Sequence, residues 1–429
     1  MIYGYTSVLT EVRRCRYGLT PMRISTDARE SEIEPAVNWI SGLIGAAVDK
    51  RVLAFDQSEH KNPLVITSHF RDNFPLECAL AKARKYKKKT GRLPKGDEFD
   101  LLYSFLVSAQ RIRAELPQAA ISRFEGALRG ALKDSSGLRP FAYEVGIAAH
   151  LMQKNWDVEF ADLCGTARFD FLARQDNIEI EVECKTTSGD TGRKIHRQEV
   201  YRLANLILPT TQQLADTAGC HLVRVIIPNR LAPTDRELAE IASIVASAGS
   251  EKCAASGDLA QVEYRYENIS AWPEPNRDRD AREFFKKRLD AKNSHVVFYS
   301  RPGHSIVAVM IASAKADSVV DAIATQARAA ANQSSGNRPA LIAMHLIDQI
   351  SRPALEVLVK TQSGLQAIAH AVFKDRLHVD SIVFTLPQLA QIEADGARLL
   401  TGDVGIILND KPIFKCDRIR SIFRPTSPG

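Results

Sequence analysis

The sequence contains no run of the roughly 18 unbroken apolar residues that a membrane-spanning helix needs. Its first ten residues, MIYGYTSVLT, lack both the basic segment and the long apolar run that open a secretory signal. Its seven cysteines are scattered and form no C-x-x-C pair, which excludes a disulfide framework and a cysteine-rich zinc site. We therefore expect a cytoplasmic protein with free thiols and no membrane partner.

Several common catalytic motifs are also missing. The chain has no H-E-x-x-H, G-x-S-x-G or G-x-G-x-x-G sequence, and so no motif of a zinc protease, a serine hydrolase or a dinucleotide-binding fold. What it does contain is 429 residues, of which 45% are hydrophobic and 25% charged. That composition is typical of a globular protein with two or three domains of ~150 residues each.

The net charge of +6 is concentrated at the start of the chain. Residues 1–135 contain 22 Lys and Arg against 16 Asp and Glu, whereas the rest of the chain contains 35 of each. Within this part, residues 81–95 carry eight basic side chains and no acid. Because neutralising phosphates releases condensed counterions, such a segment favours a nucleic-acid partner. The alternative is a solvated basic segment without a ligand. The candidate contacts are Lys85, Lys87, Lys88 and Lys89.

Hydrophobic periodicity divides the chain into three parts. Residues 1–135 are expected to be helical, with helices at 98–107 and 121–132. Residues 136–230 are expected to form an αβββαβ unit, and residues 231–429 a separate C-terminal α/β section to which no motif assigns a role. The six elements of the central unit are expected at 141–154, 156–162, 167–174, 178–185, 193–215 and 221–228. The expected fold class is therefore α/β.

One strand-like run combines acids with a lysine. Strict alternation in IEIEVECK, residues 178–185, places three glutamates and Lys185 on one face. Asp170 lies in the preceding run, close enough in sequence for a hairpin to bring it beside Glu183. Two adjacent carboxylates repel each other unless a cation lies between them, and hard divalent ions prefer oxygen ligands. The pattern therefore favours a metal site at Asp170 and Glu183.

With an acid-bearing strand followed by Glu183-Cys184-Lys185, the sequence resembles the PD-(D/E)XK, or restriction endonuclease-like, nuclease superfamily over about residues 140–229. In that superfamily an Asp on one strand and an E-x-K on the next bind Mg²⁺ within an αβββαβ core. The resemblance implies that Asp170 and Glu183 bind Mg²⁺, with Mn²⁺ able to substitute, and that Lys185 is the catalytic lysine. Phe169 stands where the motif has its proline, which is not a ligand.

The two flanking helices supply further candidates. Glu144 falls within the apolar arc of the first helix, and the resemblance implies that it supports or binds the metal; the alternative is a glutamate paired with an Arg or Lys. Polar and basic residues of the second helix and the loop before it are candidate nucleic-acid contacts, although a solvated helix face gives the same pattern. These residues are Lys194, Arg197, Gln198 and Arg202.

We therefore expect a magnesium-dependent endonuclease, a hydrolase that cleaves phosphodiester bonds of DNA rather than RNA, in defence against foreign DNA. Double-strand cutting by one site per chain would favour a homodimer. The alternative is a nuclease-fold protein that binds nucleic acid or a partner protein without cleaving it. A third hypothesis, a small-molecule enzyme centred on the C-terminal section, requires a deep polar pocket outside residues 140–230.

Overall fold

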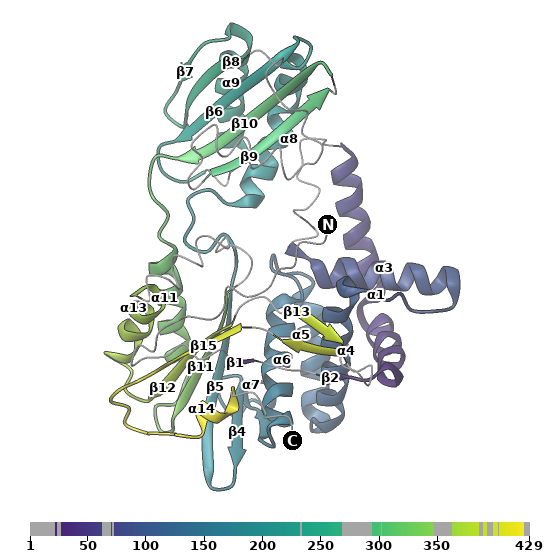
Figure 1. Cartoon of the computed structure of the whole chain (residues 1–429), viewed down its shortest axis with the longest axis vertical. Coiled ribbons are helices and arrows are strands. Elements are labelled where there is room, and N and C mark those ends of the chain that lie inside the picture. Colours follow the sequence, from purple (N-terminus) through teal and green to yellow (C-terminus); the bar gives the residue numbers. More distant parts are fainter. Residues whose placement is uncertain are drawn as a thin grey trace, which may run out of the picture.

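The computed structural model describes residues 22–23, 27–61, 70, 73–231, 234–267, 294–301, 303–346, 363–385, 389–392, 398–401 and 403–423. They form a mixed α/β protein with two mixed sheets, a small antiparallel sheet and a helical N-terminal layer (Figure 1). The small sheet joins β2 (Asp27–Ala28), β13 (Leu389–Ile392) and β14 (Arg398–Thr401). None of the helices in these ranges is long and apolar enough to cross a bilayer.

The N-terminal layer is helical, as expected. It consists of α1 (Glu30–Lys61), α3 (Pro75–Thr90), α4 (Asp97–Glu115) and α5 (Gln118–Ala131). Helix α4 begins with Asp97, Glu98 and Asp100, whose charges interact favourably with the positive end of the helix dipole. Helix α3 ends at Gly91, which adopts φ +72° and donates its N–H to the Lys87 carbonyl. These helices share one apolar core with α6 (Arg139–Gln153) and one face of the larger sheet.

The larger sheet has the strand order β1-β15-β12-β11-β5-β4-β3. Strands β3 (Asp157–Phe160), β4 (Phe171–Gln175) and β5 (Ile178–Thr187) form an antiparallel meander. Strands β11 (Ala340–Leu346) and β12 (Val379–Thr385) continue parallel to β5. Strands β15 (Asp403–Leu408) and β1 (Met22–Arg23) then run antiparallel to β12 and β15, respectively.

Helices cover both faces of this sheet, and the alternation of β11 shows how. Leu341 and Ala343 belong to the core shared with α6, whereas Ile342 and Met344 belong to a second core. That second core contains α11 (Val319–Ala331) and α13 (Ser363–Phe373). The result is a three-layer arrangement in which α6 and α11 flank β5. The short helix α7 (Ala161–Cys164) directly follows β3, and the short helix α14 (Ile419–Ile422) follows β15 after ten residues.

The expected composition of the αβββαβ unit is wrong in its last two elements. The expected helix and strand at 193–215 and 221–228 do form, as α8 (Arg197–Leu214) and β6 (Gly219–Ile227). However, β6 belongs to the second sheet, of order β7-β8-β6-β10-β9, which lies apart from the first (Figure 1). The remaining elements of this part are β7 (Ala255–Ser256), β8 (Gln261–Glu267), β9 (Ser294–Arg301), β10 (Ser305–Ser313) and α9 (Asp235–Glu251).

The physical reason is strand pairing. Strand β6 pairs over its full length with β10, and on its other side with β8, while α8 packs with α9 in a core of its own. In the larger sheet, α11 and β11 take the places expected for the second helix and the fourth strand. They complete the helix–three strands–helix–strand order. The expectation of a separate C-terminal section is also corrected, because β11, β12 and β15 belong to the sheet of β5. Along the chain, residues 188–318 thus separate β5 from α11 and β11, although β5 and β11 are adjacent in the sheet.

Candidate functional site

Asp170 and Glu183 face each other at the start of β4. The register pairs Phe171 with Val182, so one further step places Asp170 opposite Glu183, as the hairpin argument predicted. The expected strand at 167–174 begins only at Phe171, because Asp170 bonds through its side chain instead. Its Oδ2 accepts the backbone N–H of Cys184 at 2.6 Å, and its carbonyl accepts the N–H of Ala161 at 3.0 Å. These two bonds fix the carboxylate beside β5.

Glu183 and Lys185 point to the same face of β5 and contact each other. The Lys185 Nζ donates to Glu183 Oε1. The Glu183 side chain is fully buried, whereas that of Lys185 keeps 30% of its surface exposed. Glu183 Oε2 is also buried and accepts no hydrogen bond from the described residues. One carboxylate oxygen of the pair is therefore available to a ligand, and a cationic donor lies next to it at the surface.

The electrostatics of this cluster disfavour bare carboxylates. Burial raises the pKa of Asp170 to about 6 and that of Glu183 to about 7, and the charge of Asp170 adds to the second shift. For Lys185, burial lowers the pKa, but the hydrogen bond and charge of Glu183 outweigh it, so its pKa is raised overall. Burial raises the pKa of Glu144 well above its ordinary value, and Asp170 and Asp162 raise it further. A bound cation would relieve this repulsion.

Asp162 was missed by the sequence analysis. It lies on α7, and its charge raises the pKa values of both Glu144 and Asp170, so it belongs to the same acidic neighbourhood. An isolated aspartate in a short helix has no periodic pattern that would single it out.

The arrangement of the acidic side chains determines how a metal ion could bind. Over the ranges that the structure describes, no three His, Cys, Asp or Glu side chains converge closely enough to hold an ion between them. Asp170 and Glu183 are a pair; the charge of Asp162 acts on Asp170, and the charges of the pair raise the pKa of Glu144. Mg²⁺ is commonly bound through one or two carboxylates, with water and substrate phosphate completing its coordination. The residues fit that mode rather than an all-protein cage.

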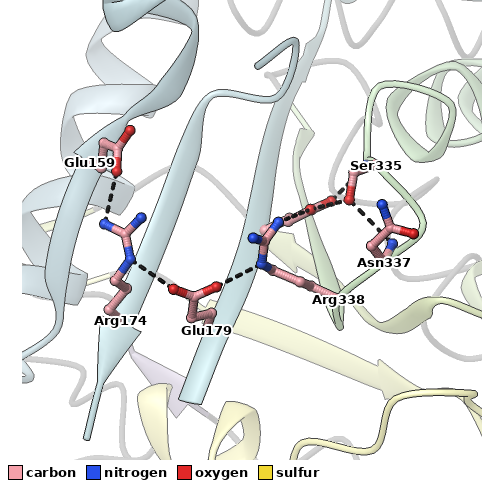
Figure 2. Close-up of polar contacts among 7 residues, drawn as sticks. Glu159, Arg174, Glu179, Ser335, Asn337 and Arg338 are labelled. Carbon is pink, nitrogen blue, oxygen red and sulfur yellow. Dashed lines mark hydrogen bonds and ion pairs between the residues drawn. The ribbon is translucent and has the colours of Figure 1, made fainter. Parts of the chain in front are cut away.

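The other two glutamates of the strand have a different environment (Figure 2). Glu179 accepts from Arg174 at 3.0 Å and from Arg338 at 2.6 Å, and Arg174 also pairs with Glu159 at 2.8 Å. Glu181 accepts the backbone N–H of Ser335 at 2.7 Å. These bonds tie the meander to the segment before β11. Of the three glutamates that alternation places on one face, only Glu183 joins the Asp170 cluster.

The basic candidates separate into two groups. Lys85, Lys88 and Lys89 are exposed near the end of α3, while Lys87 pairs with Glu34 at 2.6 Å and donates to Asn38. Helix α3 packs mainly on α1 and α4. The segment is thus partly neutralised and lies in the helical layer.

The second group lines a cavity of about 1050 Å³. Lys194, Arg197, Gln198 and Arg202 all contribute to its wall, together with the loop that directly follows β5. Basic residues that the sequence analysis missed line it too, because they come from segments far apart in the chain; they are Arg51, Lys133, Arg139, Arg193 and Arg230. Since residues 188–202 form much of the wall, this cavity is not the separate pocket that a C-terminal small-molecule enzyme would require.

Comparisons with known proteins found no relative. No protein-family model matches the chain, and neither the curated proteins nor the solved structures gave a match.

Proposed function

We propose that this protein is a metal-dependent nuclease whose active site is formed by Asp170, Glu183 and Lys185. The observation that carries the proposal is the placement of two buried carboxyl groups on adjacent strands, with a lysine bonded to one of them and reaching the surface. Carboxylates held in this way are costly in a protein that has no cation for them. A structural role alone gives no reason for that arrangement.

The chain topology supports the finer fold assignment. The elements α6, β3, β4, β5, α11 and β11 follow the αβββαβ order of the PD-(D/E)XK superfamily, once residues 188–318 are treated as an insertion. The acid-bearing strand and the E-x-K strand are neighbours within that order. This agreement between topology and motif position favours the superfamily over an unrelated α/β sheet.

Each residue has a role that its contacts allow. Asp170, fixed by the Cys184 N–H, and the open Oε2 of Glu183 would hold Mg²⁺ or Mn²⁺. The ion, when bound, would orient the scissile phosphate and lower the pKa of an attacking water. The Lys185 ammonium can donate to that water or to a phosphate oxygen, because its side chain reaches the surface. Asp162 adds negative potential that favours a divalent cation, and a bound cation would favour the ionised form of Glu144.

The test is cleavage of a panel of labelled single- and double-stranded DNA and RNA by the full chain. We expect cutting with Mg²⁺ or Mn²⁺ and none in EDTA, restored when the metal is added back. Among the substrates we expect DNA to be cut in preference to RNA. Salt-sensitive binding without any cutting across the panel would instead support a nuclease-fold protein that only binds nucleic acid.

A further inference from the structure

The cavity of about 1050 Å³ lies next to the proposed active site along the chain. Strand β5 ends at Thr187, and Ser188 is the first of seven consecutive wall residues, 188–194. In extended chain, Lys185 and Ser188 are separated by about 10 Å at most. The other walls come from α1, from residues 133–136, from Arg139 at the start of α6, and from α8 and α11.

The cavity wall is strongly basic. It carries eight Lys and Arg side chains against three Asp and Glu, and two of the eight, Arg202 and Arg193, pair with Asp235 and Asp317 just outside the wall. The acid Asp190 accepts the backbone N–H of Arg197, at 3.2 Å to each carboxylate oxygen, and so is partly satisfied within the wall. Helices α8 and α11 both begin at the cavity, which adds the positive ends of two helix dipoles. A concave surface of one charge sign focuses its field and attracts an anion of many charges.

The wall also carries a group of aromatic rings. Phe55 stacks on Phe70 with 4.3 Å between ring centroids and on Phe74 with 4.9 Å. The edge of this group meets Tyr201 of α8, whose ring lies 5.2 Å from Phe70 at 72°. The Arg51 guanidinium covers the ring of Phe74 at 4.0 Å. Phe55, Phe70 and Tyr201 remain partly exposed in the cavity.

We propose that this cavity binds a short single-stranded segment of nucleic acid and delivers its next phosphodiester to Lys185. Basic grooves that track the backbone, combined with aromatic rings on which bases stack, are how single strands are bound. A base stacks on the partly exposed rings, and the phosphates contact the basic wall. The proposal rests on the proposed nuclease function, whose substrate class it narrows.

The size of the cavity argues against a paired duplex. Its volume is near the upper end of the ~300–1,000 Å³ range of pockets that enclose a small molecule, so it accommodates a few nucleotides. A duplex, whose major groove alone is about 12 Å wide, is too large to enter a cavity of this volume. A frayed end, a gap or a single-stranded tail is the part of a substrate that fits.

The experiment measures binding in EDTA, with the catalytic residues unchanged. Fluorescence anisotropy of a labelled single strand of ~10 nucleotides is compared with that of a blunt duplex of the same sequence. The cavity variant is Lys194→Gln with Arg230→Gln, and the matched control is Lys374→Gln with Lys411→Gln, two exposed lysines outside the cavity. Tyr201→Leu tests the stacking separately.

We expect the cavity variant to bind the single strand about tenfold more weakly and to lower the slope of log affinity against log salt by about 1.4, as for two lost phosphate contacts. The control pair should lose less affinity for the single strand. Tyr201→Leu should weaken binding without changing the slope of log affinity against log salt. Thermal unfolding confirms that each variant is folded. If the cavity variant behaves like the control, or if blunt duplex binds as tightly as the single strand, the proposal is wrong. Because binding is measured without metal, a failure of cleavage alone would overturn the nuclease proposal and leave this result standing.

Discussion

At the scale of single residues, the contact between Lys185 and Glu183 is the central feature of the site. The lysine occupies one oxygen of the glutamate, and the other oxygen is buried without a partner among the described residues. A lysine in this position competes with a metal ion for the carboxylate but also supplies a donor at the place where a phosphate would lie. Removing the lysine should therefore keep or strengthen metal binding but weaken catalysis, so the two effects can be measured separately.

Replacing Lys185 by Ala should lower the cleavage rate about 100-fold, since a donor to the developing charge is lost. The same change should leave the Mn²⁺-induced rise in unfolding temperature intact or increase it, because a competing cation has been removed from Glu183. Lys411→Ala, an exposed lysine elsewhere, serves as the control. Single-turnover cleavage and thermal unfolding measure the two effects. Loss of the Mn²⁺ response would indicate that Lys185 has a structural role instead.

Glu77 provides a pH-dependent test away from the active site. It is fully buried on α3, where its Oε1 accepts the Leu138 N–H at 2.9 Å, and burial raises the pKa of its carboxyl. Ionisation is therefore less favourable in the folded than in the unfolded state. The stability contributed by Glu77 is complete below its unfolded pKa of about 4.5 and is lost as the pH rises through the higher folded value.

Glu77→Gln cannot ionise and keeps an oxygen for Leu138. We expect the variant and the parent to have similar unfolding free energies near pH 4, and the variant to be the more stable at pH 8. Urea unfolding at the two pH values measures the difference, in which all other titrating groups cancel. A parent that gains stability over the variant between pH 4 and pH 8 would contradict the assignment.

At the scale of elements, the loop after β5 joins the larger sheet to α11 and shapes the cavity. Gly192 has φ +72°, and its carbonyl accepts the Ser318 N–H at 2.8 Å. A Cβ at this position would lie 2.6 Å from the Ser318 carbonyl oxygen and from the Val319 Cα. Gly336 has a similar φ of +80°, but no atom lies within 4 Å of the corresponding position.

The two glycines therefore form a matched pair. Gly336→Ala should cost about 1 kcal/mol, from left-handed backbone strain alone. Gly192→Ala should cost about 2–4 kcal/mol, because a backbone clash with α11 is added to the same strain. Urea unfolding measures both values. Equal costs would show that the loop can move away from α11 without loss, and that the close approach of Gly192 does not fix this part of the cavity wall.

At the scale of the whole molecule, the local sequence pattern predicted most helices and strands of the central part of the chain. It did not predict which strands pair with each other. Alternation along β5 and the short connection to Asp170 predicted the carboxylate pair, because both are properties of neighbouring residues. Nothing local indicated that β5 pairs with β11, whose residues come more than 150 positions later, or that β6 pairs with β10 instead. The expected unit therefore contained the strands that bring Asp170 beside Glu183, but not the helix and strand that follow β5 in the larger sheet.

The basic cavity could not be predicted for the same reason. Its wall combines side chains from α1, from the segment before α6, from the loop after β5 and from α11. Except for α11, each contributes one or a few basic residues, and none of these short groups differs from a solvated surface when read alone. The conspicuous basic run of α3 gave the stronger sequence signal, but several of its charges pair with acids of neighbouring helices.

The most direct test of the central claim compares two glutamates on the same face of one strand. Glu183→Gln removes the carboxylate beside Asp170, whereas Glu179→Gln changes a glutamate that pairs with Arg174 and Arg338. Cleavage of a labelled single strand in Mg²⁺ is measured under single-turnover conditions for both variants and the parent. We predict a loss of about 100-fold or more for Glu183→Gln and a rate within about threefold of the parent for Glu179→Gln. Equal rates for the two variants would contradict the assignment of Glu183 to the active site.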